Sequence, residues 1–270
     1  MRKVFQNRKE GGGRKRNVGR FLIGTSGWSY ASWKGVFYPV DLPNARWLEF
    51  FTGQFPTTEI NSSFYHLPKP STYEKWASQV PQGFIFSVKA SRFITHVKRL
   101  KDVEAPWRLF LSHARPLGAH LGPILFQFPA SFLRDDDRLE GFLKMVLKSA
   151  SPKRHLRLVC EFRHESWFSN DVYRMLNRLG AVLCIGDSGR YPRRDVVTGD
   201  FVYVRFHGRS RLFASNYTRS ELEEEAEKLT GYLRNGYDAY VYFNNDAEGH
   251  AVANAKMLTN LLEKQSVRAR

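Results

Sequence analysis

The chain has 270 residues, of which 42% are hydrophobic and 14% aromatic, and it carries a net charge of +16. This length and composition predict one large globular domain or two small ones. Two cysteines argue against a disulfide framework, and no apolar run approaches the roughly 18 residues that a membrane-spanning helix needs. No signal-peptide pattern occurs at the start, so a cytoplasmic location is expected.

The positive charge is concentrated at the N-terminus. Residues 1–20 hold eight basic side chains and one acidic one, so this segment supplies +7 of the total charge. Three consecutive glycines, Gly11–Gly13, and little apolar surface predict that residues 1–20 form a disordered tail. Such a tail is either a solvated extension or a segment that binds nucleic acid through counterion release.

Strand and helix patterns alternate after the tail. Strands are predicted at 21–25, 57–61, 84–89, 123–128, 156–163, 181–187, 201–207 and 239–245. Helices are predicted at 44–54, 71–79, 102–117, 135–148, 169–179, 220–234 and 250–264. This alternation predicts a single (β/α)8 TIM-type barrel over residues 21–265, followed by a disordered end at 266–270.

The connection between the sixth and seventh strands departs from this pattern. Residues 189–199 hold no convincing helix, so the barrel is expected to be irregular there. A doubly wound open sheet is the alternative architecture. Its nucleotide-binding forms open with a turn such as GxGxxG, and the GTSGW segment at 24–28 is not one.

Seven of the predicted strands carry polar side chains near their C-terminal ends. These polar side chains share one face of the strand, and the residues that alternate with them are apolar. Side chains of a strand alternate between its faces, so residues two apart share a face. In a barrel these strand ends converge on one mouth, where active sites of this fold lie. The polar set comprises Glu59, Asn61, Lys89, Gln127, Glu161, Arg163, Asp187, Arg205, His207, Asn244 and Asp246.

The basic members of this set predict an anion site. Arginine suits bidentate binding of carboxylate or phosphate, so Arg163 and Arg205 are expected to hold an anion together with Lys89. Many barrels bind phosphate after the seventh and eighth strands. Backbone amides at the start of the last helix, with Asn244 and Asn245, could add to this site.

The acidic members and the histidines predict acid–base chemistry. Glu161 or Glu59 is expected to act as the base, and His207 or His164 as a proton donor. The alternative for Glu161 is a structural ion pair with Arg163. No metal-ligand spacing such as HExxH occurs, and the neighbouring cations would repel a metal ion, so neither a metal nor a cofactor is predicted.

Aromatic side chains in the predicted loops form a further group of candidates. The side chains that could stack on a flat ligand such as a base or a sugar ring are Trp28, Tyr30, Trp33, Tyr38, Tyr65 and Trp167. Packing of the loops against the barrel is the alternative role for the same side chains.

Seven motifs give a family resemblance: IGTSGWSYASWKGVFYP, TTEINSSFYHLP, FIFSVKASRFITH, LGPILFQFPASF, EFRHESW, YVRFHG and YFNNDAEGHAVANA. In this order they resemble the domain-of-unknown-function 72 family, also called YecE-like, over residues 21–262. The resemblance implies a TIM-type barrel whose activity is not established. It marks as site residues Trp28, Tyr30, Glu59, Asn61, Lys89, His96, Gln127, Glu161, Arg163, His164, Trp167, Arg205, His207, Tyr217, Asn244, Asn245 and Asp246.

Three hypotheses about function stay open. The first is an enzyme-like barrel, a hydrolase or lyase, that binds a phosphorylated sugar, a nucleotide or a phosphodiester at the mouth. The second is a non-catalytic protein that binds nucleic acid through the basic tail. The third is a sensor that binds a small ligand without turnover.

Overall fold

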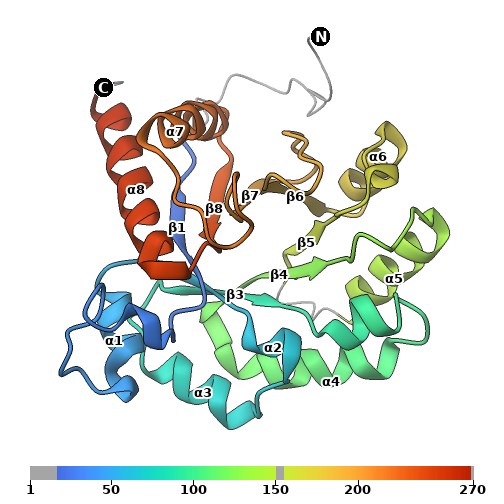
Figure 1. Ribbon diagram of the computed structural model, residues 1–270. Coiled ribbons are helices and arrows are strands. Elements are labelled where there is room, and N and C mark those ends of the chain that lie inside the picture. The colour runs from blue at the N-terminus through green and yellow to red at the C-terminus, as the bar shows by residue number, and fades with distance from the viewer. Residues whose placement is uncertain (1–16, 150–154, 269–270) are drawn as a thin grey trace.

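Eight parallel strands form a closed barrel in the computed structural model, which describes residues 17–149 and 155–268 (Figure 1). Each strand pairs with the next in the chain, and β8 pairs with β1 to close the ring. The predicted (β/α)8 fold is therefore confirmed. The strands are β1 Phe21–Ser26, β2 Thr57–Ile60, β3 Ile85–Lys89, β4 Leu121–Gln127, β5 Leu158–Glu161, β6 Ala181–Asp187, β7 Phe201–Phe206 and β8 Asp238–Phe243.

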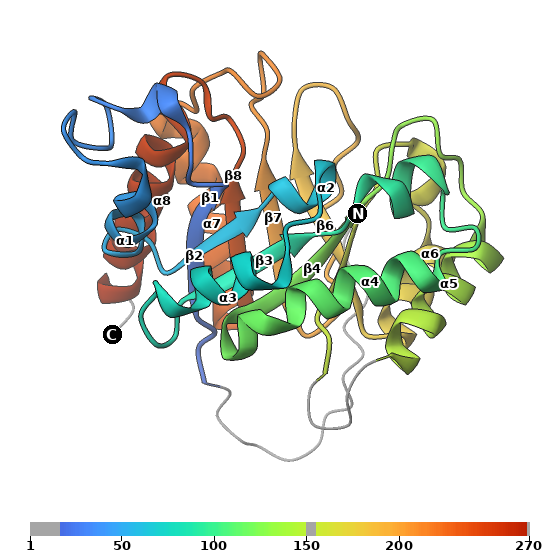
Figure 2. The ribbon, with the colours of Figure 1, turned by 90° about the horizontal axis from the view of Figure 1, so that it is seen from below.

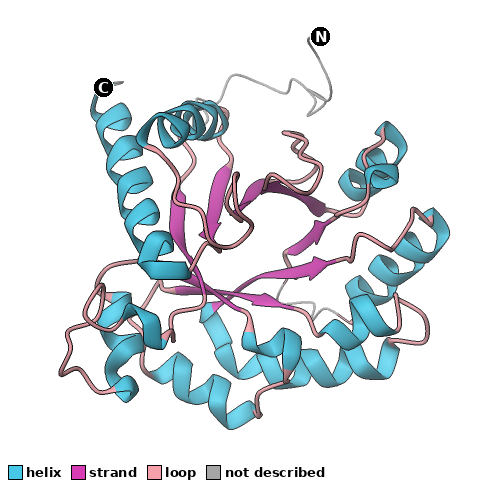
Figure 3. Cartoon of the chain, viewed as in Figure 1, coloured by secondary structure: helices cyan, strands magenta, loops and turns pink. Residues whose placement is uncertain are grey.

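Helices surround the strands on the outside of the barrel (Figure 3). The α-helices are α1 Trp47–Thr52, α2 Ser62–Tyr65, α3 Pro70–Ser78, α4 Glu104–Ala114, α5 Asp136–Lys148, α6 Asn170–Arg178, α7 Arg219–Arg234 and α8 His250–Arg268. Short 3-10 helices lie at Ala31–Trp33, Asn44–Arg46, Arg115–His120, Glu165–Trp167 and Ala247–Gly249, and one π-helix lies at Phe93–Val97. The sequence patterns predicted the long helices but missed α2 and most of these single turns.

Helix α5 illustrates how the sequence determines an outer helix. The Asp135 carboxylate accepts a hydrogen bond from a backbone N–H of the first turn, which caps the helix. Leu139, Phe142, Leu143 and Val146 then follow at helical spacing and are all buried against the barrel. Capping and apolar periodicity agree, and the predicted helix 135–148 forms almost as expected.

The connection between β6 and β7 is irregular, as predicted. Residues 188–200 form no helix, so the space between α6 and α7 is filled by a loop (Figures 1 and 3). Thr198 ties this loop to β6, because its hydroxyl donates to the Ala181 carbonyl at 2.9 Å and accepts from the Leu183 N–H at 2.8 Å. The loop therefore covers the strand in place of a helix.

The barrel has two distinct hydrophobic layers. One lies inside the ring of strands and includes Leu125, Val159, Tyr203, Tyr240 and Tyr242. The other lies between the strands and the surrounding helices and is much larger. A side chain on a strand therefore reaches either the interior or the helices, according to its alternation phase.

Both ends of the chain lie partly outside the described residues. Of the predicted tail, residues 1–16 are not among them, whereas the Gly19 N–H donates to the Leu233 carbonyl at 2.9 Å. Arg20 pairs with Asp238 at the start of β8. Helix α8 continues to Arg268, past its predicted end at 264. No helix among the described residues is long and apolar enough to cross a membrane.

Candidate active site at the C-terminal mouth

A buried ion-pair cluster centred on Arg205 lies inside the barrel, and the Arg205 side chain is fully buried. Its Nη2 donates to Glu59 Oε1 at 2.7 Å, and its Nη1 donates to Glu161 Oε2 at 2.6 Å. Glu59 also accepts hydrogen bonds from the Tyr203 hydroxyl at 2.6 Å and the Ser26 hydroxyl at 2.5 Å. Strands β1, β2, β5 and β7 thus all contribute to one cluster, which satisfies most of its buried charge.

The electrostatics of the cluster keep Glu161 ionised. Burial by itself would raise the pKa of Glu161, but the charges of Arg205 and Arg163 hold it well below its ordinary value. The Arg163 Nε donates to Glu161 Oε1 at 3.0 Å. The predicted ion pair between Glu161 and Arg163 is therefore present, and Arg205 forms a second one with the same carboxylate.

His207 lies beside this cluster as a neutral imidazole. Burial lowers the pKa of His207 to about 4, although Glu161 acts in the opposite direction. Its Nε2 lies 3.6 Å from Glu161 Oε1, and its Nδ1 lies 3.2 Å from the amide nitrogen of Asn244. The Phe213 ring packs edge-on against the imidazole. A neutral, covered imidazole does not suit the predicted role of proton donor to a ligand.

A cavity of about 540 Å³ opens at the mouth beside the cluster. Figure 2 shows the barrel turned by 90° relative to Figure 1, with the loops after β6 and β7 projecting together from one end. Three basic side chains and one carboxylate line the cavity, together with amides, aromatic rings and one imidazole. The lining residues are Tyr30, Asn61, Phe64, Tyr65, Lys89, Arg92, His96, Gln127, Arg163, Phe213, Asn244 and Asp246.

Arg163 presents its guanidinium to this cavity. The guanidinium carbon lies 4.4 Å from the centroid of the Tyr191 ring, so the helix-free connection after β6 supports it by a cation–π contact. Its Nε is bound to Glu161, and no described residue accepts a hydrogen bond from its two Nη atoms. Fixed on one side and unpaired on the other, the guanidinium is preorganised to bind an oxyanion.

Lys89 ends β3 and reaches the same cavity. The side chain is largely buried, and Nζ lies 3.9 Å from the centroid of the Phe64 ring. Burial lowers the pKa of Lys89 to about 7, and repulsion from Arg205 acts in the same direction. The amine is therefore divided between its charged and neutral forms at neutral pH.

His96 and Asp246 are two further titratable groups with shifted pKa values along the cavity wall, and burial also raises the pKa of Tyr30 there. Burial and the charge of Lys89 lower the pKa of His96 to about 4, so its imidazole is neutral at pH 7. His96 Nε2 lies 3.5 Å from the side-chain nitrogen of Gln127. Burial raises the pKa of Asp246 above its ordinary value. These two groups, unlike the buried glutamates, line the cavity directly.

The structure divides the predicted site residues into three groups. Those that line the cavity are Tyr30, Asn61, Lys89, His96, Gln127, Arg163, Asn244 and Asp246. Those that lie in or beside the buried cluster, off the cavity wall, are Glu59, Glu161, Arg205 and His207. Those that lie elsewhere are Trp28, His164, Trp167, Asp187, Tyr217 and Asn245.

Asp187 requires a correction, because it does not share the mouth face. Its strand places Val182 and Cys184 in the barrel interior, and Leu183 and Ile185 in the helix-facing core. Asp187 follows the second phase and faces outward. There its carboxylate accepts hydrogen bonds from side chains of the β6–β7 and β7–α7 loops, namely Arg193, Arg209 and Tyr217.

Tyr217 and Asn245 support the loops around the mouth instead of lining it. The Tyr217 hydroxyl donates to Asp187 Oδ1 at 3.1 Å and accepts from the Gly208 N–H at 3.0 Å. Asn245 follows the outward phase of β8, and its amide donates to Asn254 of α8 at 2.9 Å. Both residues are buried, so the predicted ligand contacts are not available to them.

Trp167 and His164 are structural in the loop after β5. The Trp167 ring is fully buried and stacks on Phe162 with centroids 4.7 Å apart. Its indole N–H donates to the Phe132 carbonyl at 2.7 Å. His164 caps the following 3-10 turn, because its Nδ1 accepts from the backbone N–H of Ser166 at 3.2 Å.

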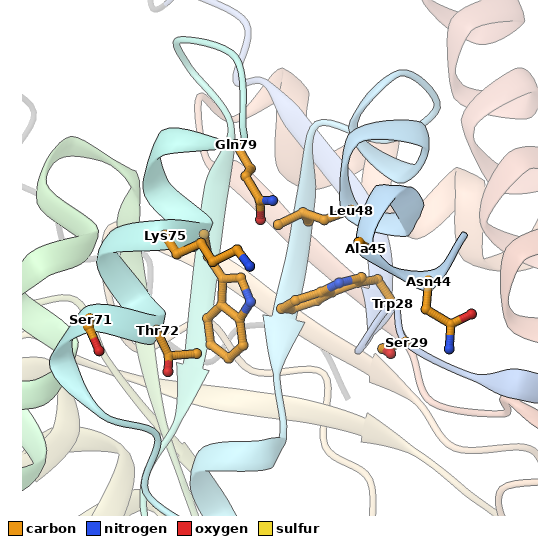
Figure 4. Close-up of a pocket in the computed structure, with 10 residues that line it drawn as sticks. Trp28, Ser29, Asn44, Ala45, Leu48, Ser71, Thr72, Lys75 and Gln79 are labelled. Carbon is orange, nitrogen blue, oxygen red and sulfur yellow. The ribbon is translucent and has the colours of Figure 1, made fainter. Parts of the chain in front are cut away.

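Trp28 lies in a second cavity, of about 550 Å³, between α1 and α3 on the side of the barrel. Its ring packs edge-to-face against Trp76 with centroids 5.1 Å apart. Figure 4 shows Lys75 of α3, and Gln79 directly after this helix, on one side of the cavity, with Leu48 of α1 near the other. Trp28 is therefore separate from the mouth.

Sequence reasoning missed several cavity residues. Phe64 lies on the four-residue helix α2, and Arg92 directly precedes the π-helix after β3. Tyr65 of α2, which was a predicted stacking residue, also lines the cavity. Phe213 sits in the loop after β7 with a left-handed backbone, φ 63°. A single turn after a strand has no periodic pattern of apolar residues. The family motifs around the strand ends were the available signal for these residues. Within the described ranges, no three His, Cys, Asp or Glu side chains gather as a metal site.

Comparison with known proteins agrees with this architecture. The model of the family described as "Protein of unknown function DUF72" matches residues 22–270, nearly the whole chain. The chain belongs to the DUF72 family. This confirms the resemblance seen in the seven motifs, and with it the barrel that the resemblance implied.

Relatives of this DUF72 protein include the UPF0759 protein YunF of Bacillus subtilis, which is 25% identical over 89% of this chain and 94% of its own length. The UPF0759 protein YecE of Escherichia coli K12 is 29% identical over 41% of this chain and 38% of its own length. Neither name states an activity.

Solved structures of the family share the fold. A DUF72 protein from Thermotoga maritima superposes with a TM-score of 0.81 at 30% identity and covers 90% of this chain and 99% of its own. One from Enterococcus faecalis has a TM-score of 0.77 at 20% identity, with 90% and 95% covered. A glycoside hydrolase family 5 enzyme from Prevotella bryantii has a TM-score of 0.51 at 9% identity and covers 93% of this chain and 96% of its own. This similarity shows the shared barrel fold alone.

Proposed function

We propose that the mouth cavity binds a small anionic ligand of the phosphorylated sugar, nucleotide or phosphodiester class. The unpaired Nη atoms of Arg163 are the observation that carries the proposal. Arg92 and Lys89 line the same cavity, and Asp246 is the carboxylate among its lining residues. A phosphate or carboxylate placed there would receive a bidentate hydrogen bond from a fixed guanidinium.

The buried cluster supports the proposal of an anion site. Glu59 and Glu161 would make the mouth acidic if they were exposed, but Arg205 pairs with both of them beneath its surface, and Arg163 supplies the second positive charge. Arg205 therefore acts as a structural counterion and not as the anion ligand expected from sequence. Arg163 remains as the arginine that both contacts the cluster and faces the cavity.

The rest of the wall suits the uncharged part of such a ligand. Asn61, Gln127 and Asn244 offer amide donors and acceptors for hydroxyl or base groups. Tyr65 offers an exposed aromatic ring. For hydrolase or lyase chemistry, the neutral imidazole of His96 is the proton acceptor within reach of the ligand.

Ligand-induced thermal stabilisation tests this proposal. The panel comprises inorganic phosphate, glucose 6-phosphate, AMP and bis(p-nitrophenyl) phosphate, with glucose and adenosine as uncharged counterparts. Arg163→Met should weaken binding of the anions about 10- to 100-fold, since charge-assisted hydrogen bonds contribute about 1.5–3 kcal/mol. Arg174→Met removes an exposed arginine of α6 and should leave binding unchanged.

Three outcomes would count against the proposal. The first is that none of the anions stabilises the wild type. The second is that the uncharged ligands stabilise it as much as the anions do. The third is that Arg163→Met binds the anions as tightly as Arg174→Met does. Titration calorimetry at a temperature where each variant is folded separates lost affinity from lost stability.

A further inference from the structure

Lys89 has surroundings unlike those of a lysine that serves only as a charge. It is 7% exposed, and its Nζ lies 3.9 Å from the Phe64 ring centroid. No described residue accepts a hydrogen bond from Nζ or forms an ion pair with it. The two carboxylates of the buried cluster, Glu59 and Glu161, are already bound to Arg205. The amine therefore faces the cavity without a partner of its own.

The backbone around Lys89 fixes this position. Lys89 ends β3 in register with Leu125 of β4, so its main chain is part of the barrel. The Ser63 hydroxyl donates to the Lys89 carbonyl at 2.7 Å, which ties α2 to the strand end. Phe64 of α2 is thereby held against the lysine. A rigid strand and an anchored helix together position the amine.

We propose that Lys89 forms an imine with an aldehyde or ketone group of the ligand that this cavity binds. The inference rests on the proposed anion site and names the substrate class as a carbonyl compound that also carries an anionic group. Arg163 would hold the anion, and the carbonyl carbon would then lie within the same cavity as the Lys89 amine.

The charge environment makes a neutral amine available. Burial, followed by repulsion from Arg205, brings the pKa of Lys89 to about 7, compared with about 10.4 for an exposed lysine. Charged and titratable groups that face it come from several elements. They are Glu59 of β2, Arg92 and His96 at the π-helix, Glu161 and Arg163 of the β5 end, and Arg205 of β7.

The step balances without a further reactant. The lone pair of the neutral amine forms a C–N bond to the carbonyl carbon, and the carbonyl oxygen takes up a proton to give a carbinolamine. Loss of one water molecule, with the C–N lone pair forming the double bond and one proton taken up by the leaving hydroxyl, gives a protonated imine. Overall, one ammonium and one carbonyl yield one iminium and one water.

Reductive trapping tests the inference. The full chain is incubated with pyridoxal 5′-phosphate or glyceraldehyde 3-phosphate at pH 7, reduced with sodium borohydride and mapped by mass spectrometry. We expect one adduct per chain, on Lys89, with glycerol 3-phosphate competing. Trapping should rise to half of its maximum at about pH 7, because the pKa of Lys89 is about 7.

The controls separate this step from anion binding. Lys89→Met should lose the adduct, whereas Lys75→Met, which removes an exposed lysine of α3, should keep it. Even if Lys89→Met does not fold, the map of the wild type still decides the matter. Adducts spread over exposed lysines, or no adduct on Lys89, would overturn the inference. If phosphate still binds through Arg163 in that case, only the imine step fails; if phosphate does not bind either, the anion site fails as well.

Discussion

Removing the positive charge of Arg205 should strongly destabilise this barrel. Arg205→Met leaves two buried carboxylates, Glu59 and Glu161, without the guanidinium that lies 2.7 and 2.6 Å from them. Neither carboxylate can reach water without opening the barrel, because the exposed fractions of the two side chains are 0% and 4%. Glu161 keeps its ion pair with Arg163, but Glu59 is left as a buried carboxylate without a cationic partner.

The expected loss is about 3–5 kcal/mol in the free energy of unfolding, which is the usual cost of removing one partner of a buried ion pair. For a chain of this size this corresponds to a fall in Tm of roughly 6–20 °C. Arg178→Met is the matched control. It breaks an exposed pair with Glu140 and should cost less than about 1 kcal/mol.

The pH dependence gives a second signature of the same effect. In the wild type the pKa of Glu161 lies below its unfolded value, so its contribution to stability is present above pH of about 4.3 and is lost as pH falls further. Without Arg205, only Arg163 and His207 oppose the effect of burial, so the pKa of Glu161 in the folded state should be higher than in the wild type. The penalty of the substitution should then grow as pH rises above about 4.3.

Urea unfolding of the wild type and both variants at pH 5 and pH 8 measures these quantities. The account expects the difference between wild type and Arg205→Met to be larger at pH 8. Adding Glu59→Gln to Arg205→Met should recover part of the loss, since it removes the carboxylate that has lost its cationic partner. A loss below 1 kcal/mol, or one that is equal at the two pH values, would refute the reasoning.

Two further predictions concern the scaffold. Glu225→Gln should cost about 1–3 kcal/mol in urea unfolding, because the buried carboxylate binds Arg193 and Arg209 at 2.7 Å, but phosphate affinity at the mouth should not change. A change in affinity with unchanged stability would show that this outer cluster belongs to the site. Gly24→Ala should cost about 3 kcal/mol or more, since its Cβ would lie 1.9 Å from the carbonyl oxygen of residue 57. Gly186→Ala, with no atom within 4 Å of the added Cβ, should stay within about 0.5 kcal/mol, and similar Tm values for the two would contradict the β1–β2 packing.

The fold was predictable because each long element has a repeating signal. The eight apolar runs and the intervening helical patterns required only alternation and spacing, and even the absence of a helix in 188–200 was visible in the sequence. The short helices were not predictable in this way. A single turn such as Ser62–Tyr65 buries two residues and has no period to detect.

The site was predictable only in part, for two physical reasons. Alternation correctly grouped Glu59, Lys89 and Arg205 on the interior face, but it failed at Asp187, because an apolar Cys184 occupies the interior phase of β6. Alternation also does not show how deep a side chain lies along the barrel axis. It could not show that Arg205 lies beneath the cavity while Arg163, two residues beyond Glu161, reaches it.

The most direct test of the account is a crystal structure of the protein grown with the sugar phosphate that stabilises it most. The account predicts that the phosphate lies in the mouth cavity, within hydrogen-bonding distance of the Nη atoms of Arg163, while Arg205 keeps both of its carboxylate partners. A phosphate bound instead beside Trp28 and Lys75 in the second cavity, or held by Arg205 at the expense of Glu59, would contradict it.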